Sequence, residues 1–218
     1  MFAPMVLVVL LGSLLALGCA PERPPGPPSG NIIVAAGDIA DCASEGDEAT
    51  ARLVGSIEGT VLTLGDNAYP EGTPQDFEEC YYPSWGQFKA RTRPAPGNHE
   101  YETGGSSAYF DYFGDAAGDP DKGYYSYDLG SWHIVALNSN CDKVGGCEAS
   151  SPQGQWLQRD LANHPAQCTL AYFHRPYFSD KGGTVARVKR LFTALYNGGA
   201  DVLLVGHQHI YERFRLQN

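Results

Sequence analysis

The 218-residue sequence has few basic residues, and this scarcity narrows the range of partners. Lysine and arginine number 15 against 25 aspartates and glutamates, which gives a formal net charge of −10. No run of basic residues occurs anywhere in the chain. Because nucleic acids and anionic membranes select for clustered Lys and Arg, the composition argues against a long contact with either partner. If the protein handles an anionic substrate, a local positive charge such as bound metal ions must supply the attraction.

The sequence also lacks an apolar run long enough to cross a bilayer. Its most apolar stretch, residues 5–17, is shorter than the roughly 20 residues that a membrane-spanning helix needs. The stretch is typical of a signal peptide, so residues 1–19 are predicted to direct export. The "LGCA" that follows resembles a bacterial lipoprotein box with Cys19 as the lipidated residue, and residues 20–30 are then a Pro-rich tether. Soluble secretion is the alternative, because no Lys or Arg precedes the apolar stretch.

The cysteines do not have the spacing of a zinc ribbon, so none is assigned to a metal. Five cysteines remain after Cys19, which is an odd number. Export permits disulfides. Cys141 and Cys147 flank a short loop and are the favoured pair, and Cys42 with Cys80 is a second option because both follow strand ends that could converge. The spacing alone does not fix the connectivity.

The sequence has no internal repeat and no second linker, which predicts one domain over residues 31–218. Within it, short apolar runs alternate with helical patterns, as in layered α/β proteins. Strands are predicted at residues 31–38, 60–66, 168–174 and 200–209, with two more inside 124–139 around a turn at Leu129 and Gly130. Helices are predicted at residues 47–57, 151–164 and 185–197.

Several predicted strands end in side chains that can bind a metal ion, and a Pro/Gly-rich loop adds two more polar residues. They are Asp38, Asp66, His174, His207 and His209 at the strand ends, and Asn98 and His99 in the loop "RPAPGNHE". Ligands of open α/β sheets bind beyond the carboxyl ends of the strands, so these side chains are expected to meet there. The spacing of His207 and His209 would point both imidazoles to the same side of an extended strand.

Each of these motifs is common when taken alone. A Gly-Asp pair after a strand usually makes a turn, and a single His on a strand is more often a core residue than a ligand. Their joint occurrence in this order is what favours a binding site. The two remaining histidines, His133 and His164, lie outside such motifs and are interpreted as structural.

Five blocks of the sequence resemble the calcineurin-like metallophosphoesterases, most closely the purple acid phosphatase branch and its bacterial secreted relatives. The blocks are "GDIAD", "GDNAY", "GNHE", "FHRP" and "GHQHIYER", and they extend from about residue 33 to residue 213. The second and the last are the specific ones. The resemblance implies an α/β fold in the form of a four-layer α-β-β-α sandwich of two mixed sheets, and it makes residues 31–218 a catalytic domain.

The resemblance also implies a dinuclear metal centre. The first metal is then held by Asp38, Asp66, Tyr69 and His209. The second is held by Asp66, Asn98, His174 and His207, so that Asp66 bridges the two. Carboxylates with a phenolate suit Fe³⁺, whereas an amide oxygen and two neutral imidazoles suit Fe²⁺, Zn²⁺ or Mn²⁺. His99 and Arg175 are then the catalytic contacts to the substrate phosphate.

The activity implied is hydrolysis of phosphate monoesters on a small phosphorylated substrate, with the metals activating a water. A phosphodiesterase or nucleotidase with the same centre is an alternative, and so is a weakly active phosphate-binding surface protein. The oligomeric state stays open.

The sequence departs from this family pattern in two places. The loop "PYFSDKGGT" has no His where relatives commonly have one, which leaves the general acid open. The chain also stops at Asn218, whereas relatives continue with further strands, so an incomplete catalytic domain with an unpaired sheet edge is expected. The short linker leaves no room for the accessory β domain that plant relatives carry.

Overall fold

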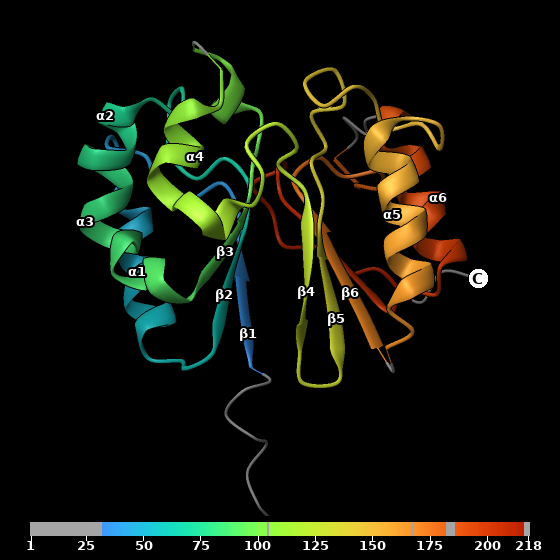
Figure 1. Ribbon diagram of the computed structural model, residues 1–218. Coiled ribbons are helices and arrows are strands. Elements are labelled where there is room, and N and C mark those ends of the chain that lie inside the picture. Colours follow the sequence, from blue (N-terminus) through green and yellow to red (C-terminus); the bar gives the residue numbers. More distant parts are fainter. Residues whose placement is uncertain (1–31, 104, 167, 182–185, 216–218) are drawn as a thin grey trace, which may run out of the picture.

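The computed structural model describes residues 32–103, 105–166, 168–181 and 186–215 as two sheets packed face to face with helices on both outer sides (Figure 1). This is the four-layer α-β-β-α arrangement that the sequence motifs implied. The predicted signal peptide, the Pro-rich tether and Cys19 lie outside the described residues. Within the described ranges, no helix combines the length and apolarity that a membrane crossing requires.

The two sheets differ in their strand directions. The first has the order β1 (Ile33–Ala36), β2 (Thr60–Leu64) and β3 (Thr92–Ala95), with parallel pairing throughout. The second has the order β4 (Tyr125–Leu129), β5 (Trp132–Ala136), β6 (Cys168–Phe173) and β7 (Val202–Val205). It is mixed, because β4 and β5 form an antiparallel hairpin while β5, β6 and β7 are parallel.

Helices cover the outer face of each sheet (Figure 1). Those beside the first sheet are α1 (Gly46–Gly55), α2 (Pro74–Asp76), the π-helical turn η1 (Phe77–Tyr81), α3 (Tyr82–Ser84), η2 (Trp85–Arg91), α4 (Ser107–Phe113) and η4 (Gly114–Ala117). Those beside the second are α5 (Pro152–Asn163), η5 (Ala186–Val188) and α6 (Lys189–Asn197). One further short turn, η3 (His99–Tyr101), follows β3.

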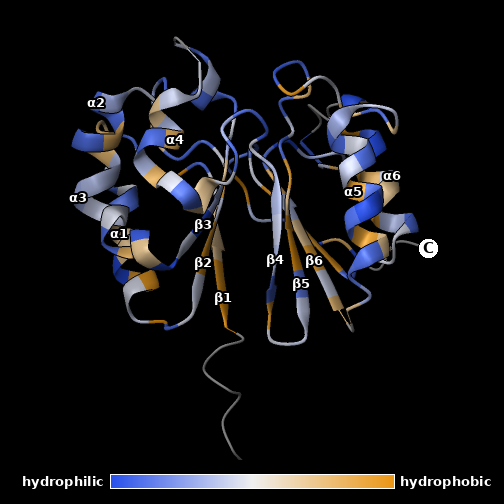
Figure 2. Ribbon diagram, in the orientation of Figure 1, coloured by the Kyte–Doolittle hydropathy of each residue, from blue (hydrophilic) through white to orange (hydrophobic). Residues whose placement is uncertain are grey.

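Three apolar layers hold the four structural layers together. Leu62, Ile134 and Tyr172 belong to the layer between the sheets. The other two layers join each sheet to its helices and are centred on residues such as Trp85 and Leu157, both fully buried. In Figure 2 the hydrophobic colour marks strands such as β1 and β6 and parts of the helices, whereas β4 is pale or hydrophilic. Burying one large side chain of this kind contributes about 1.5–3 kcal/mol, so these layers fix how the two sheets dock.

The predicted strands and helices are found, but two predictions were wrong. The Pro/Gly-rich segment was interpreted as a loop, whereas Thr92–Ala95 is the strand β3. Pro94 argued against a strand here, because proline lacks a backbone N–H and cannot donate to a neighbouring strand. The strand β3 tolerates Pro94 because β2 is the only partner of β3 among the described strands. The last strand was predicted to include both histidines of "HQH", yet β7 ends at Val205.

The structure confirms both disulfides that the sequence suggested. Cys42 pairs with Cys80 and thereby ties the loop after β1 to η1. Cys141 pairs with Cys147 and closes the loop after β5. Cys168 at the start of β6 is a half-buried free thiol. Two disulfides are typical of proteins that fold in an oxidising, extracytoplasmic environment.

Candidate metal centre

The predicted metal ligands meet where strands of both sheets end, and four of them have an unusual backbone. The φ angles are 58° at Asp38, 50° at Asp66, 77° at His207 and 49° at His209. Left-handed backbone at non-glycine residues is uncommon and clusters at functional sites. At His207 and His209 it turns the chain sharply just after β7. The two imidazoles therefore serve two different clusters, rather than lying on one side of a strand as the sequence spacing suggested.

The first cluster contains four ligand atoms from residues that follow strands of both sheets. The Tyr69 Oη lies 3.1 Å from Asp38 Oδ1, 3.3 Å from Asp66 Oδ2 and 3.1 Å from His209 Nε2. The His209 Nε2 is in turn 3.3 Å from Asp38 Oδ1. These four residues are the set that the family resemblance implied for the first metal. A cavity of about 330 Å³ lies beside them and is lined in part by Asp38, Tyr69 and His209.

The second cluster is built around His174, which is fully buried. Its Nε2 lies 3.0 Å from Asp66 Oδ2, 3.2 Å from Asn98 Oδ1 and 3.1 Å from His207 Nδ1. The other ring nitrogen, Nδ1, lies 2.9 Å from the Leu64 carbonyl oxygen, which can only accept a hydrogen bond. His174 therefore carries a proton on Nδ1, and Nε2 is the ring nitrogen that faces the cluster.

The spacing of these atoms fits two metal ions. Neighbouring ligand atoms in the two clusters are 3.0–3.3 Å apart. Ligands about 2.0–2.2 Å from one ion are separated by about this distance in tetrahedral or octahedral coordination. Asp66 Oδ2 belongs to both clusters and lies at their junction. Converging carboxylate, amide, phenol and imidazole lone pairs repel one another unless a cation or protons lie among them.

The protonation states of the cluster residues also suit metal binding. Burial raises the pKa of Asp66, but hydrogen bonding and charge from His174 outweigh it and lower the value to about 2, so the shared carboxylate is ionised. Burial and the neighbouring His174 and Arg175 lower the pKa of His207 to about 4, which keeps its imidazole neutral. Burial and the charges of Asp66 and Asp38 raise the pKa of Tyr69. Only a strongly Lewis-acidic ion would convert this phenol to a phenolate.

The two predicted substrate contacts lie beside the clusters and outside the two ligand sets. The backbone N–H of His99 donates to Asp66 Oδ1 at 2.9 Å, and its ring Nδ1 donates to the Pro70 carbonyl oxygen. The His99 Nε2 is then left 3.7 Å from Asp66 Oδ2, on a side chain that is 27% exposed. Arg175 places NH1 3.4 Å from His207 Nε2. Both side chains thus adjoin the clusters, and their catalytic roles stay predictions.

Glu100, the last residue of the "GNHE" block, supports the site although its position in the sequence predicted no role for it. Its carboxylate is 1% exposed. It accepts hydrogen bonds from the backbone nitrogens of Asn67 at 2.6 Å, Gly97 at 2.6 Å and Asp66 at 3.1 Å. Glu100 therefore clamps the loop after β2 to the turn after β3. Burial and the charge of Asp66 raise the pKa of Glu100 to about 7.

Gly97 allows these two loops to approach so closely. A Cβ at this position would overlap the carboxylate and the backbone nitrogen of Asp66. Gly65 has a similar function in the facing loop, where it adopts a φ of 87° and a Cβ would lie 2.7 Å from the Cβ of His174. Close contact therefore requires glycine in both "GDNAY" and "GNHE", and in the first the left-handed backbone requires it as well.

The polar residues after β5 also support the site and were not foreseen. Asn140 Nδ2 donates to the Gly97 carbonyl oxygen at 2.9 Å, and Ser139 Oγ accepts from the Arg175 backbone nitrogen at 3.0 Å. Both residues are buried. The signal was present in the sequence, because "VALNSN" changes abruptly from apolar to polar residues at a strand end, as the metal-ligand blocks do.

Comparison with known proteins agrees with this geometry. The profile of a family described as calcineurin-like phosphoesterase matches residues 15–211. Purple acid phosphatase 15 of Arabidopsis thaliana is 26% identical over 201 residues, which cover 75% of this chain and 37% of the relative. Purple acid phosphatase 22 of the same plant is 33% identical over 99 residues, or 42% of this chain and 22% of the relative. The chain thus spans well under half the length of either relative.

A solved structure shows the same fold. Purple acid phosphatase PPD1 from yellow lupin (Lupinus luteus) seeds superimposes with a TM-score of 0.55 at 19% sequence identity. The superposition covers 81% of this chain and 37% of the lupin chain. At this identity the likeness supports the arrangement of sheets and helices only.

Proposed function

Because this chain belongs to the calcineurin-like phosphoesterase family, we propose that it hydrolyses phosphate monoesters with two metal ions held at the strand ends. One observation carries the proposal. The seven ligand candidates form two clusters that share Asp66 Oδ2, with neighbouring ligand atoms 3.0–3.3 Å apart. The donors of each cluster are the residues that the family resemblance implied for one ion.

The donor types support a different metal in each cluster. Asp38, Asp66 and Tyr69 offer hard anionic oxygens, which favour Fe³⁺. Asn98 and the two imidazoles of His174 and His207 favour a divalent ion, Fe²⁺, Zn²⁺ or Mn²⁺. When bound, two such ions supply Lewis-acid activation of the phosphate ester and of a water.

Side chains of the protein then hold the ligands in place and bind the substrate. Asp66 would hold both ions, while Glu100 and the carbonyl oxygen of Leu64 hold Asp66 and His174 in place. Arg175 orients a phosphate oxygen through its guanidinium. His99 keeps Nδ1 donating to Pro70, so its Nε2 faces the substrate and, when the imidazole is protonated at both nitrogens, donates to a phosphate oxygen or to the leaving group.

The substrate is then a small phosphorylated molecule outside the cytoplasm. Up to five positive charges in the two ions attract phosphate locally against a body of net charge −10. The same net charge disfavours nucleic acid as a partner. Export rests on the predicted signal peptide and on the two disulfides. Attachment to a membrane would be through a lipid on Cys19.

Metal analysis combined with two chromogenic substrates tests the proposal. The purified protein should contain two metal ions per chain and hydrolyse p-nitrophenyl phosphate faster than bis(p-nitrophenyl) phosphate. A preference for the bis-ester would instead make the protein a phosphodiesterase with the same centre. A protein with neither metal nor turnover would be a phosphate-binding surface protein, and the proposed function would be wrong.

A further inference from the structure

A second group of histidines and carboxylates lies at the opposite end of the second sheet. It comprises His133 at the start of β5, Asp160 and His164 at the end of α5, and Asp128 near the end of β4. We call these four residues the far-end cluster. The hairpin turn between β4 and β5 lies at this end, whereas the candidate metal centre lies beyond the carboxyl ends of β5, β6 and β7. None of the four contributes to the strand-end clusters.

Three of these side chains bring ligand atoms together at metal-binding distances. His133 Nε2 lies 2.9 Å from Asp160 Oδ2, and His164 Nδ1 lies 3.3 Å from Asp160 Oδ1. One ligand atom from each residue falls within 4.8 Å of the other two. The two imidazole rings stack at a centroid distance of 4.6 Å with an interplanar angle of 10°, so the exposed ring of His164 must rotate for both lone pairs to point at one ion. Zinc ligands at about 2.0–2.1 Å in a tetrahedral site are about 3.3 Å apart, which agrees with these spacings.

Further contacts orient the two buried ligands. Asp128 Oδ1 lies 2.8 Å from His133 Nδ1, so a carboxylate holds the ring nitrogen that faces away from Asp160. Ser126 Oγ donates to Asp160 Oδ1 at 2.7 Å. A carboxylate or hydroxyl behind a metal ligand is the usual means by which proteins fix its orientation. His133 and Asp160 are buried, while the His164 side chain is 45% exposed and gives the cluster one side open to solvent.

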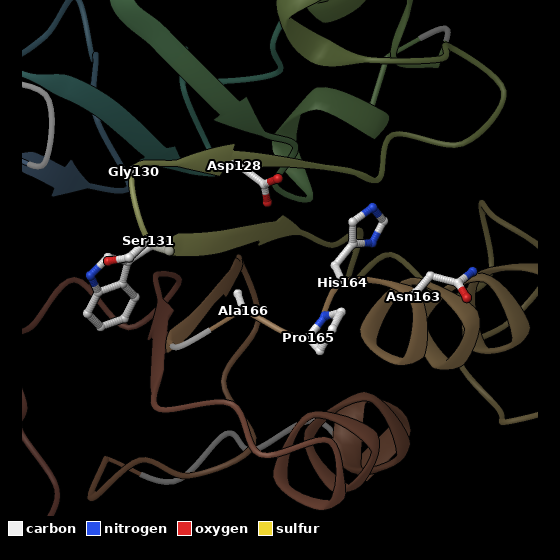
Figure 3. A pocket seen from close by; sticks show the side chains of 8 residues that line it. Asp128, Gly130, Ser131, Asn163, His164, Pro165 and Ala166 are labelled. Carbon is white, nitrogen blue, oxygen red and sulfur yellow. The ribbon is translucent and has the colours of Figure 1, made fainter.

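The open side adjoins a pocket of about 390 Å³. Asp128 and His164 are among the residues that line it, together with Ser131 and Asn163 (Figure 3). The two come from different elements, β4 and the end of α5 (Figure 3). An ion bound here could therefore enter from solvent and keep a water or a small ligand on its pocket side.

We propose that the far-end cluster binds one divalent cation of the zinc type through His133 Nε2, Asp160 and His164 Nδ1. Two imidazoles and a carboxylate form a ligand set that suits Zn²⁺, and three protein ligands leave a fourth position toward the pocket. The carboxylates of Asp128 and Asp160 offset the charge of the ion. His164 Nδ1 also lies 2.9 Å from the Asp160 carbonyl oxygen, a contact that the ion would replace.

Counting bound zinc in matched variants tests this proposal independently of phosphatase activity. The wild type, saturated with Zn²⁺ and dialysed, should hold one more ion per chain than His164→Ala. Asn163→Ala is the control, because Asn163 lines the same pocket but offers no ligand in the cluster. It should hold as many ions as the wild type. Equal counts for His164→Ala and the wild type would overturn the proposal.

An anomalous difference map at the zinc absorption edge provides the second measurement. The expected result is a peak within about 2.0–2.2 Å of His133 Nε2 and an Asp160 carboxylate oxygen. Zinc-soaked crystals without such a peak would show that the far-end cluster is only a hydrogen-bonded group of side chains. This outcome would leave the strand-end centre and the proposed function untouched, since the map reports the two places separately.

Discussion

The strand-end clusters and the far-end cluster use the same residue types in different structural settings. The strand-end ligands come from both sheets, from Asp38 and Asp66 beyond the first to His174 and His207 beyond the second. The far-end ligands come from one hairpin and its covering helix. Forming the strand-end centre therefore requires the two halves of the sandwich to dock, whereas the far-end cluster requires only the second half.

The strand-end clusters and the far-end cluster also differ in the pKa values of their histidines. His207, beside His174 and Arg175, has a pKa lowered to about 4 by burial and those neighbours. At the far end, burial lowers the pKa of His133, but hydrogen bonds to Asp128 and Asp160 outweigh it and raise the pKa above its usual value. The imidazole of His207 is thus neutral and ready to bind a metal. At His174, burial lowers the pKa, but the hydrogen bond and charge of Asp66 outweigh it and raise the pKa. At His174 and at the far end, a metal must therefore compete with a proton.

The largest expected effect follows from the shared carboxylate. Asp66→Asn removes the negative charge that both strand-end clusters use, so both ions should be lost. The value of kcat/KM should fall by more than about 10³-fold, because the loss exceeds that of a single transition-state donor. Metal analysis and p-nitrophenyl phosphate kinetics measure the two effects. Retention of both ions by Asp66→Asn would show that this carboxylate does not bridge them.

A smaller effect is expected at His99, which contacts the substrate but holds no metal in this scheme. His99→Ala should lower kcat by about 10²–10³-fold, the typical effect of losing a donor or general acid. Its metal content should stay at the wild-type value. If His99→Ala loses metal as Asp66→Asn does, the division between ligands and substrate contacts is wrong.

The close approach of the two ligand loops can be tested at a glycine. Gly97→Ala places a Cβ against Asp66 and should destabilise the fold by about 1–3 kcal/mol, as overpacking commonly does. It should also weaken metal binding, because Asp66 must move. Gly55→Ala in α1 is the matched control, since its Cβ meets Phe88 only at 3.8 Å. Denaturant titration of both variants compares them, and equal stability would contradict the packing argument.

The smallest structural change should remove a spectroscopic signal. A Tyr69 phenolate on Fe³⁺ gives a visible charge-transfer band, so the oxidised iron-loaded protein should be pink to purple. Tyr69→Phe should lose this colour and keep its fold, since the phenol oxygen contacts only residues of the first cluster among the described contacts. A colourless wild type with stoichiometric iron in its oxidised state would show that Tyr69 is not a ligand.

The approach of the candidate ligands was foreseeable because each belongs to a block with its own residue order, and all but Asn98 lie at or soon after a recognisable strand. The left-handed backbone at His207 was not foreseeable, since the spacing of "HQH" also suits a strand. The strand β3 was missed because Pro94 lies inside it. His133, Asp160 and His164 belong to no block, and only the packing of α5 against the hairpin brings them together.

The most direct test of the dinuclear centre is an anomalous difference map from crystals of the iron-loaded protein that is active in solution. Two strong peaks are expected about 3.5–4 Å apart, one on each side of the Asp66 carboxylate. One should lie among Asp38, Tyr69 and His209, and the other among Asn98, His174 and His207. A single peak, or two peaks that do not share Asp66, would contradict the dinuclear centre.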